Sequence, residues 1–116
     1  MNETVYKVIS RTAFAEAKAK GYFDGSADDR RDDFIHLSSA DQLEGTLAQH
    51  FAGQTGLVLL AVDAASLGAR LRWERSRGGA LFPHHYGPLD LSALLWHQQL
   101  ELGADGRHRL PARVLP

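Results

Sequence analysis

The sequence feature that most restricts the fold is the apolar run Leu57-Val58-Leu59-Leu60-Ala61-Val62. An uninterrupted run of this length is typical of a strand that is covered on both faces of its sheet. It is also the longest apolar run in the chain, and a membrane-spanning helix needs about 20 apolar residues. The run therefore predicts a central strand of a layered domain and no membrane span.

Patterns before this run predict two helices between shorter strands. The first strand is expected at Val5–Ile9, and a helix capped by Ser10 or Thr12 follows it and ends near Lys20, just before Gly21. Residues 21–33 are rich in Gly, Ser, Asp and Arg and are expected to form a loop. A strand at Phe34–Leu37 comes next. Ser39 and Gln42 have the capping-box spacing that starts the second helix, on which Leu43, Leu47 and Phe51 form the apolar face.

Patterns after the run predict mainly strands. A helical turn is expected at Asp63–Gly68, followed by a strand with Leu71 and Trp73 on its core face. A turn at Gly78-Gly79 and a rigid loop at Phe82–Pro88 come next. The last strand is expected from Leu94 to Leu102, and its residues on one face are Leu94, Trp96, Leu100 and Leu102. This order predicts an α+β fold: a single domain over residues 1–116, with a mixed or antiparallel sheet and two main helices. The chain has no Gly-x-Gly-x-x-Gly or P-loop motif, which disfavours the common nucleotide-binding folds.

Composition narrows the classes of function. The chain has 116 residues and no cysteine, which excludes disulfides, thiolate nucleophiles and cysteine metal sites. Met1–Ile9 has neither the basic start nor the apolar stretch of a secretory signal, so cytoplasmic residence is the default expectation. A net charge of −1 disfavours nucleic acid as a partner. A cluster of four arginines nevertheless suits a small anionic ligand: Arg70, Arg72, Arg75 and Arg77.

His36 is the leading candidate for a functional residue. It lies in the strand Phe34–Leu37 with Phe34 on the same side, where it can line a pocket, hold a ribose hydroxyl or act as a general base. The alternative is a partly buried histidine that is bonded to a neighbouring backbone carbonyl. Ser38 can contact the same ligand, although Ser38 or Ser39 is also needed to cap the following helix.

Two further stretches carry candidate residues. Glu74, between Arg72 and Arg75, can stabilise a developing positive charge or simply form an exposed ion pair. The loop at Phe82–Pro88 can present His84 or His85 and Tyr86 to a ligand, or Phe82 and Tyr86 can close the end of the core. The spacing of His36, His84 and His85 matches no metal-site pattern, so no metal site is expected.

The motifs together resemble a known family. They are Tyr6-Lys7-Val8-Ile9, Gly21-Tyr22, Phe34-Ile35-His36-Leu37-Ser38, Gln42-Leu43, Trp73-Glu74 and Phe82-Pro83-His84-x-Tyr86-Gly87-Pro88. In this order they resemble a bacterial domain-of-unknown-function family, family 952, from about Val5 to Leu100. That family resembles the ADP-ribosyltransferase-like superfamily, which implies a bent sheet with a cleft that holds NAD in active relatives. In such relatives a first-strand histidine or arginine contacts a ribose, and a glutamate on a later strand supports the transition state. The first-strand position is Lys7 here, and Glu74 belongs to the family's Trp-Glu motif.

These observations support three hypotheses about function. The first is an enzyme, or former enzyme, that binds NAD or a related nucleotide, with implied chemistry of the ADP-ribosyl-transfer type. In this hypothesis His36 holds the ribose or acts as a base, Arg70 or Arg72 contacts phosphate, and Glu74 supports the positive charge that develops. The second is a non-catalytic module for a small metabolite or a protein partner. The third, which the charge disfavours, is a nucleic-acid or modified-nucleotide binder that uses the arginine cluster. The sequence leaves open whether the protein is an enzyme.

Overall fold

The apolar run forms β4 (Leu57–Asp63), an inner strand of an antiparallel sheet in the order β1-β4-β8-β9. The computed structural model describes residues 3–114, without the side chain of Arg77. In it, every residue from Leu57 to Val62 is buried, as the run predicts. β4 pairs with β1 along one edge and with β8 along the other. The prediction of a covered central strand is therefore confirmed.

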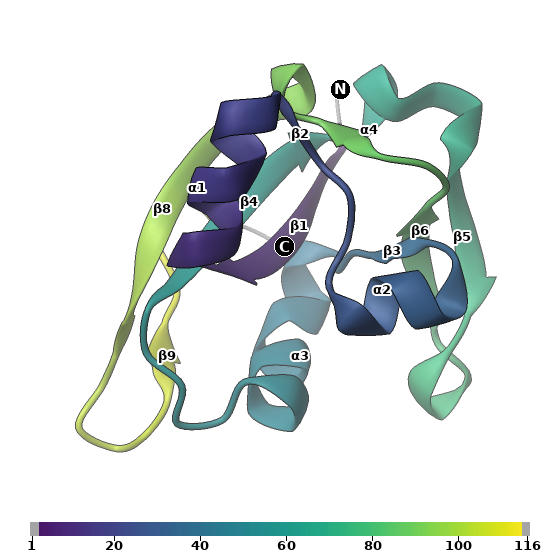
Figure 1. Cartoon of the computed structure of the whole chain (residues 1–116). Coiled ribbons are helices and arrows are strands. Elements are labelled where there is room, and N and C mark those ends of the chain that lie inside the picture. The colour runs from purple at the N-terminus through teal and green to yellow at the C-terminus, as the bar shows by residue number, and fades with distance from the viewer. Residues whose placement is uncertain (1–2, 115–116) are drawn as a thin grey trace.

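Further elements surround this sheet (Figure 1). The other strands are β1 (Thr4–Ser10), β2 (Tyr22–Phe23), β3 (Ile35–His36), β5 (Leu71–Arg75), β6 (Leu81–His85), β7 (Leu89–Asp90), β8 (Leu94–Leu102) and β9 (His108–Arg109). The α-helices are α1 (Arg11–Lys20), α2 (Ala27–Asp32), α3 (Leu43–His50) and α4 (Ala64–Leu67). β2 and β7 form a two-stranded sheet, while β3, β6 and β5 form a three-stranded one. The chain thus has an α+β architecture with an antiparallel, curled main sheet.

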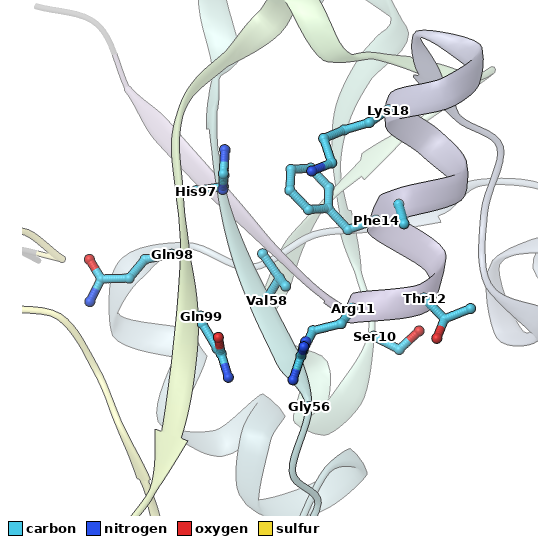
Figure 2. Close-up of a pocket in the computed structure, with 11 residues that line it drawn as sticks. Ser10, Arg11, Thr12, Phe14, Lys18, Gly56, Val58, His97, Gln98 and Gln99 are labelled. Atoms are coloured by element: carbon cyan, nitrogen blue, oxygen red, sulfur yellow. The ribbon is translucent and has the colours of Figure 1, made fainter.

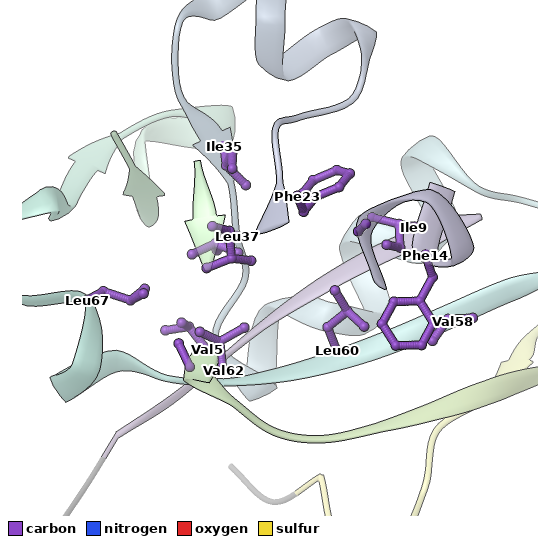
Figure 3. Packing of buried hydrophobic residues seen from close by; sticks show 13 residues of the cluster. Val5, Ile9, Phe14, Phe23, Ile35, Leu37, Val58, Leu60, Val62 and Leu67 are labelled. Atoms are coloured by element: carbon purple, nitrogen blue, oxygen red, sulfur yellow. The ribbon is translucent and has the colours of Figure 1, made fainter. Parts of the chain in front are cut away.

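Successive residues of β4 point to opposite faces of the sheet, so they enter two different cores. Val58, Leu60 and Val62 pack with Phe14 and Ala17 of α1 on one face, where Phe14 lies beside Val58 (Figure 3). On the other face the alternate residues pack with the apolar side of α3: Leu57, Leu59 and Ala61 contact the cluster of Leu43 and Leu47. Both helices are needed because each covers one face of the same strand.

The ends of α1 follow from local sequence. The Ser10 hydroxyl accepts a hydrogen bond from the Ala13 amide at 3.0 Å, and Gly21 ends the helix in the left-handed region with φ +90°. Phe14 and Ala17 are the buried residues of this helix, as its spacing predicts. Ser10 rather than Thr12 is the cap.

The prediction of a loop at residues 21–33 is wrong, because this stretch contains β2 and α2. Ser26 and Asp29 form a reciprocal capping box that starts α2, and Asp33 ends it in the left-handed region with φ 65°. The helix has one buried residue, Asp29, and therefore shows no apolar period in the sequence. With α2 the fold has three main helices around the site and sheet rather than two.

Three other expectations need correction. The expected loop Phe82–Pro88 is strand for its first half, because β6 pairs with both β3 and β5. Trp73 does not face the core, since its side chain is 38% exposed. β5 is an edge strand, and Glu74 rather than Trp73 points toward β6. Leu94 lies on the opposite face from Trp96 and Leu100, because the β4–β8 pairing shifts register between Ala61 and Val62.

Among the described residues, no helix has the length and apolar character needed to cross a membrane.

Candidate functional site

The candidate site is a pocket of about 590 Å³ beside β1. Its walls come from β1, α2, β3, α3 and β6, and they include four of the residues singled out from the sequence: Lys7, His36, Ser38 and His84. Strand pairing brings them together, since His36 lies opposite His84, and Tyr6, next to Lys7, forms an isolated bridge with Ser38. A volume of this size is typical of small-molecule sites.

One wall of the pocket is held by a buried ion pair. The Lys7 ammonium lies 3.0 and 3.1 Å from the two carboxylate oxygens of Asp29 and donates to the His36 carbonyl at 2.8 Å. The Asp29 carboxylate also accepts from the backbone amides of Ser26 and His36. Both charged side chains are almost fully buried. Lys7 and Asp29 therefore join β1 to α2 across the pocket.

The surroundings of Asp29 favour its ionised form. Burial by itself raises the pKa of Asp29, but the hydrogen bond from His36, the charge of Lys7 and the backbone donors outweigh burial and hold that pKa well below its usual range. For Lys7, burial lowers the pKa of the ammonium, and the neighbouring Asp29 carboxylate opposes this effect. The wall therefore depends on a carboxylate that stays charged.

His36 is saturated by carboxylates. Its Nδ1 lies 2.6 Å from Asp29 Oδ1, and its Nε2 lies 2.9 Å from Asp32 Oδ2. An ionised carboxylate only accepts, so both bonds form together only when both ring nitrogens carry a proton. His36 thus lines the pocket, which is one of the two alternatives that the sequence left open. Its ring nitrogens are also bonded, but to carboxylates of α2 and not to a backbone carbonyl.

His84 belongs to a second polar cluster. Its Nδ1 lies 2.8 Å from Oε1 of Glu74, and the Tyr86 hydroxyl donates to the same oxygen at 2.8 Å. The hydrogen bond from His84, followed by that from Tyr86, lowers the pKa of Glu74. Phe34 stacks on the His84 ring with the ring centroids 3.9 Å apart. The imidazole is therefore fixed in both position and orientation.

The other nitrogen of His84 is not satisfied. Nε2 is buried and has no hydrogen-bond partner within residues 3–114. Buried polar atoms in native proteins are nearly always paired, so an unpaired one calls for an explanation such as a ligand or a catalytic role. It is the single strongest sign of function in the pocket.

The remaining sequence candidates divide into two groups. The Ser38 hydroxyl pairs with the Thr46 hydroxyl of α3 at 2.8 Å inside the pocket, and Ser39 forms the capping box with Gln42. Glu74 and Tyr86 are absent from the described lining and reach the pocket only through His84.

Arg70, Arg72 and Arg75 lie outside the described pocket lining, in which Arg31 is the arginine present. The carbonyl of Arg70 accepts from the Tyr86 amide at 2.9 Å, and the guanidinium of Arg72 lies over the Tyr86 ring at 5.0 Å. They support the Tyr86 loop rather than the pocket. No three histidines or carboxylates in the described part of the chain form a group suited to a metal ion, and His85 donates to the Gly87 carbonyl instead.

Sequence reasoning missed Asp29 and Asp32, the residues that organise this pocket. The signal for Asp29 was the Ser26-x-x-Asp29 spacing, which marks a helix start. Its pairing with Lys7 could not be read from the chain, because 22 positions separate the two residues.

A second, more open pocket of about 900 Å³ lies between α1 and β8 (Figure 2). Its lining includes Arg11, Phe14 and Lys18 from α1, facing His97 and Gln99. Lys18 covers the ring of Phe14, which also contacts the His97 ring at 4.6 Å. None of the candidate site residues named from the sequence lines this groove, and the unpaired buried atom found in the described residues belongs to the other pocket.

The low pKa of Asp29 predicts a loss of stability in acid. In the unfolded chain an aspartate titrates near its ordinary pKa of about 3.9. The unfolded state therefore binds more protons than the native state below about pH 5, and the free energy of unfolding falls by up to about 1.4 kcal/mol per pH unit for one such carboxylate. Urea unfolding at pH 7, 5, 4 and 3 measures this slope. A free energy that stays constant between pH 5 and 3 would contradict the ionic role of Asp29.

The crystal structure of protein CC0527 from Caulobacter crescentus superimposes with a TM-score of 0.91 at 50% sequence identity, over 96% of this chain and 97% of that chain. The solution NMR structure of CC0527 gives a TM-score of 0.82 at 52% identity, over 90% of each chain. No functionally curated protein matches. The family model described as "Protein of unknown function (DUF952)" matches residues 8–97. The chain therefore belongs to the DUF952 family.

Proposed function

We propose that the 590 Å³ pocket binds a small polar ligand that donates a hydrogen bond to His84 Nε2. The observation that carries this proposal is the buried, unpaired nitrogen on a residue that lines the pocket. A buried polar group without a partner costs about 1–3 kcal/mol, which a ligand donor would recover on binding. Because Nε2 is covered in the free protein, the ligand replaces the side-chain contacts that now shield it.

The resemblance to ADP-ribosyltransferase-like proteins suggests which ligands come first. NAD and ADP-ribose carry ribose hydroxyls, which are donors of the kind that Nε2 lacks. The ribose-bearing part of such a nucleotide is therefore the candidate occupant, beside the Ser38–Thr46 hydroxyl pair. The charges give the pyrophosphate less support, because Lys7 is already paired with Asp29, and Arg31 in the lining is paired with Asp28 and Asp32. Arg70 and Arg72 lie outside the described lining.

ADP-ribosyl transfer would require more than this binding mode. In that chemistry a glutamate supports the positive charge that develops on the ribose, so it has to face the ligand. Glu74 instead binds the far side of the His84 ring. We therefore place nucleotide binding ahead of transfer, and the non-catalytic module remains the alternative: it predicts that Glu74→Ala leaves function intact.

The test is an NMR titration with NAD, ADP-ribose and adenosine. Binding is expected to shift backbone signals near Ser38, Thr46 and His84. His84→Phe keeps a ring that can stack on Phe34 but removes Nε2, and it should weaken binding by roughly 5- to 150-fold, which is the equivalent of one hydrogen bond to a buried group. His97→Phe alters an exposed histidine in the other groove and is the matched control.

The outcomes separate the parts of this proposal. If all three compounds leave the spectrum unchanged, nucleotide binding is excluded, and a wider panel of hydroxylated metabolites tests the pocket itself. If a compound binds the His84→Phe variant as tightly as the native protein, His84 is not the ligand's acceptor.

A further inference from the structure

We propose that this pocket also performs acid–base chemistry, with His84 as its proton acceptor and with Glu74 as the positioning residue. The inference rests on the proposed function, because the proton would come from the bound ligand. It adds an activity that ligand binding alone does not require.

The tautomer follows from the hydrogen bond at Nδ1. Glu74 Oε1 already accepts from Tyr86, and an ionised carboxylate can only accept, so the bond at 2.8 Å requires His84 Nδ1 to carry a proton. In the neutral ring Nε2 then has a free lone pair. The group that binds it must be a donor, such as an O–H or N–H of the ligand. A phosphate or carboxylate oxygen without a proton does not fit this position.

Glu74 is held in the form that this arrangement needs. The bonds from His84 and Tyr86 lower its pKa, so the carboxylate stays ionised in the neutral pH range. A carboxylate in this position orients the imidazole and stabilises the imidazolium that forms when Nε2 takes a proton. The stacking of Phe34 on His84 limits rotation of the ring away from this geometry.

The proton transfer is balanced by groups in the site. The O–H bond of the ligand breaks, its electron pair stays on the ligand oxygen, and a new N–H bond forms at Nε2. The positive charge of the ring is then neutralised by Glu74. The substrate class is therefore a small molecule with an ionisable hydroxyl or N–H at its reacting position.

His36 cannot take this role in the observed arrangement. Both of its ring nitrogens are engaged, by Asp29 at 2.6 Å and by Asp32 at 2.9 Å. The ring of His36 packs edge-on against that of His84, with the centroids 5.6 Å apart. Two neighbouring histidines thus have different environments, one saturated by carboxylates and one with a free nitrogen.

The test reads the tautomer directly from ¹⁵N NMR of the histidine side chains at pH 8, without any ligand. We expect His84 to show a protonated Nδ1 and an unprotonated Nε2. In Glu74→Met the acceptor is lost, and the signals should move toward a mixture of the two neutral tautomers. Tyr86→Phe leaves Glu74 as an acceptor and should keep the native pattern. His85, whose Nδ1 donates to the Gly87 carbonyl, is an internal reference that should not change.

A native His84 that is protonated at Nε2 overturns the proposal, whether the ring is the other neutral tautomer or an imidazolium. An unchanged pattern in Glu74→Met removes Glu74 from the positioning role. Because no ligand is present, these results are independent of the nucleotide titration. A failed titration with the expected tautomer rejects the nucleotides. A successful titration with the wrong tautomer keeps nucleotide binding but rejects both the acid–base role and the ligand donor to Nε2.

Discussion

Replacement of Asp29 by asparagine is expected to lower the free energy of unfolding by about 3–5 kcal/mol, because it leaves the buried Lys7 ammonium without its counter-charge. The side chains of Lys7 and Asp29 are only 9% and 2% exposed, so water cannot compensate the lost charge. Asparagine has nearly the same size as aspartate, and the change therefore isolates charge and hydrogen bonding from packing. Urea unfolding at pH 7 measures the effect.

Two comparison variants make this result specific. Asp28→Asn removes an exposed carboxylate that pairs with Arg31, and it should change stability by no more than about 0.5 kcal/mol. The double variant Lys7→Met with Asp29→Asn no longer has the unpaired ammonium, so it should be more stable than Asp29→Asn alone. If Asp29→Asn and Asp28→Asn had equal effects, the buried pair would not stabilise the pocket wall.

The second large effect is expected in the central strand. Leu60→Ala should lower the free energy of unfolding by about 2–5 kcal/mol, which is the range for a leucine truncated in a packed core. Leu60 is fully buried and belongs to the cluster that joins β4 to Phe14 and Ala17 of α1. The cavity left by the side chain lies between α1 and the sheet, and neither element can move without disturbing the pairing of β4.

Leu95→Ala is the matched control for this truncation. Leu95 is 51% exposed, at the point where the pairing of β8 with β4 shifts register, so the same change should cost well under 1 kcal/mol there. Thermal and urea unfolding of both variants check the difference. Similar losses in the two variants would show that Leu60 is not part of a tightly packed core.

The two halves of the candidate site differ in how far the sequence could predict them. His36 and Ser38 were predicted from the strand motif Phe34–Ser38, whereas His84 was predicted from the Pro- and Gly-containing stretch Phe82–Pro88, which was expected to be a loop. The structure brings them together with Lys7 through the pairing of β3 with β6 and the bridge between Tyr6 and Ser38. Asp29 and Asp32 were missed, because the helix that carries them is short, charged and without an apolar period.

By itself the sequence determined the central strand, the C-terminal end of α1 and the alternation that places His36 beside Phe34. These features depend on neighbours a few residues apart, so periodicity and capping rules apply to them directly. Only the tertiary structure decided that the ring nitrogens of His36 are occupied and that one nitrogen of His84 is free. That difference depends on Asp29, Asp32 and Glu74, whose carboxylates reach the two rings only after α2, β5 and β6 have packed. Hydrogen-bond partners of this kind are set by three-dimensional position, and the local pattern of the chain does not contain them.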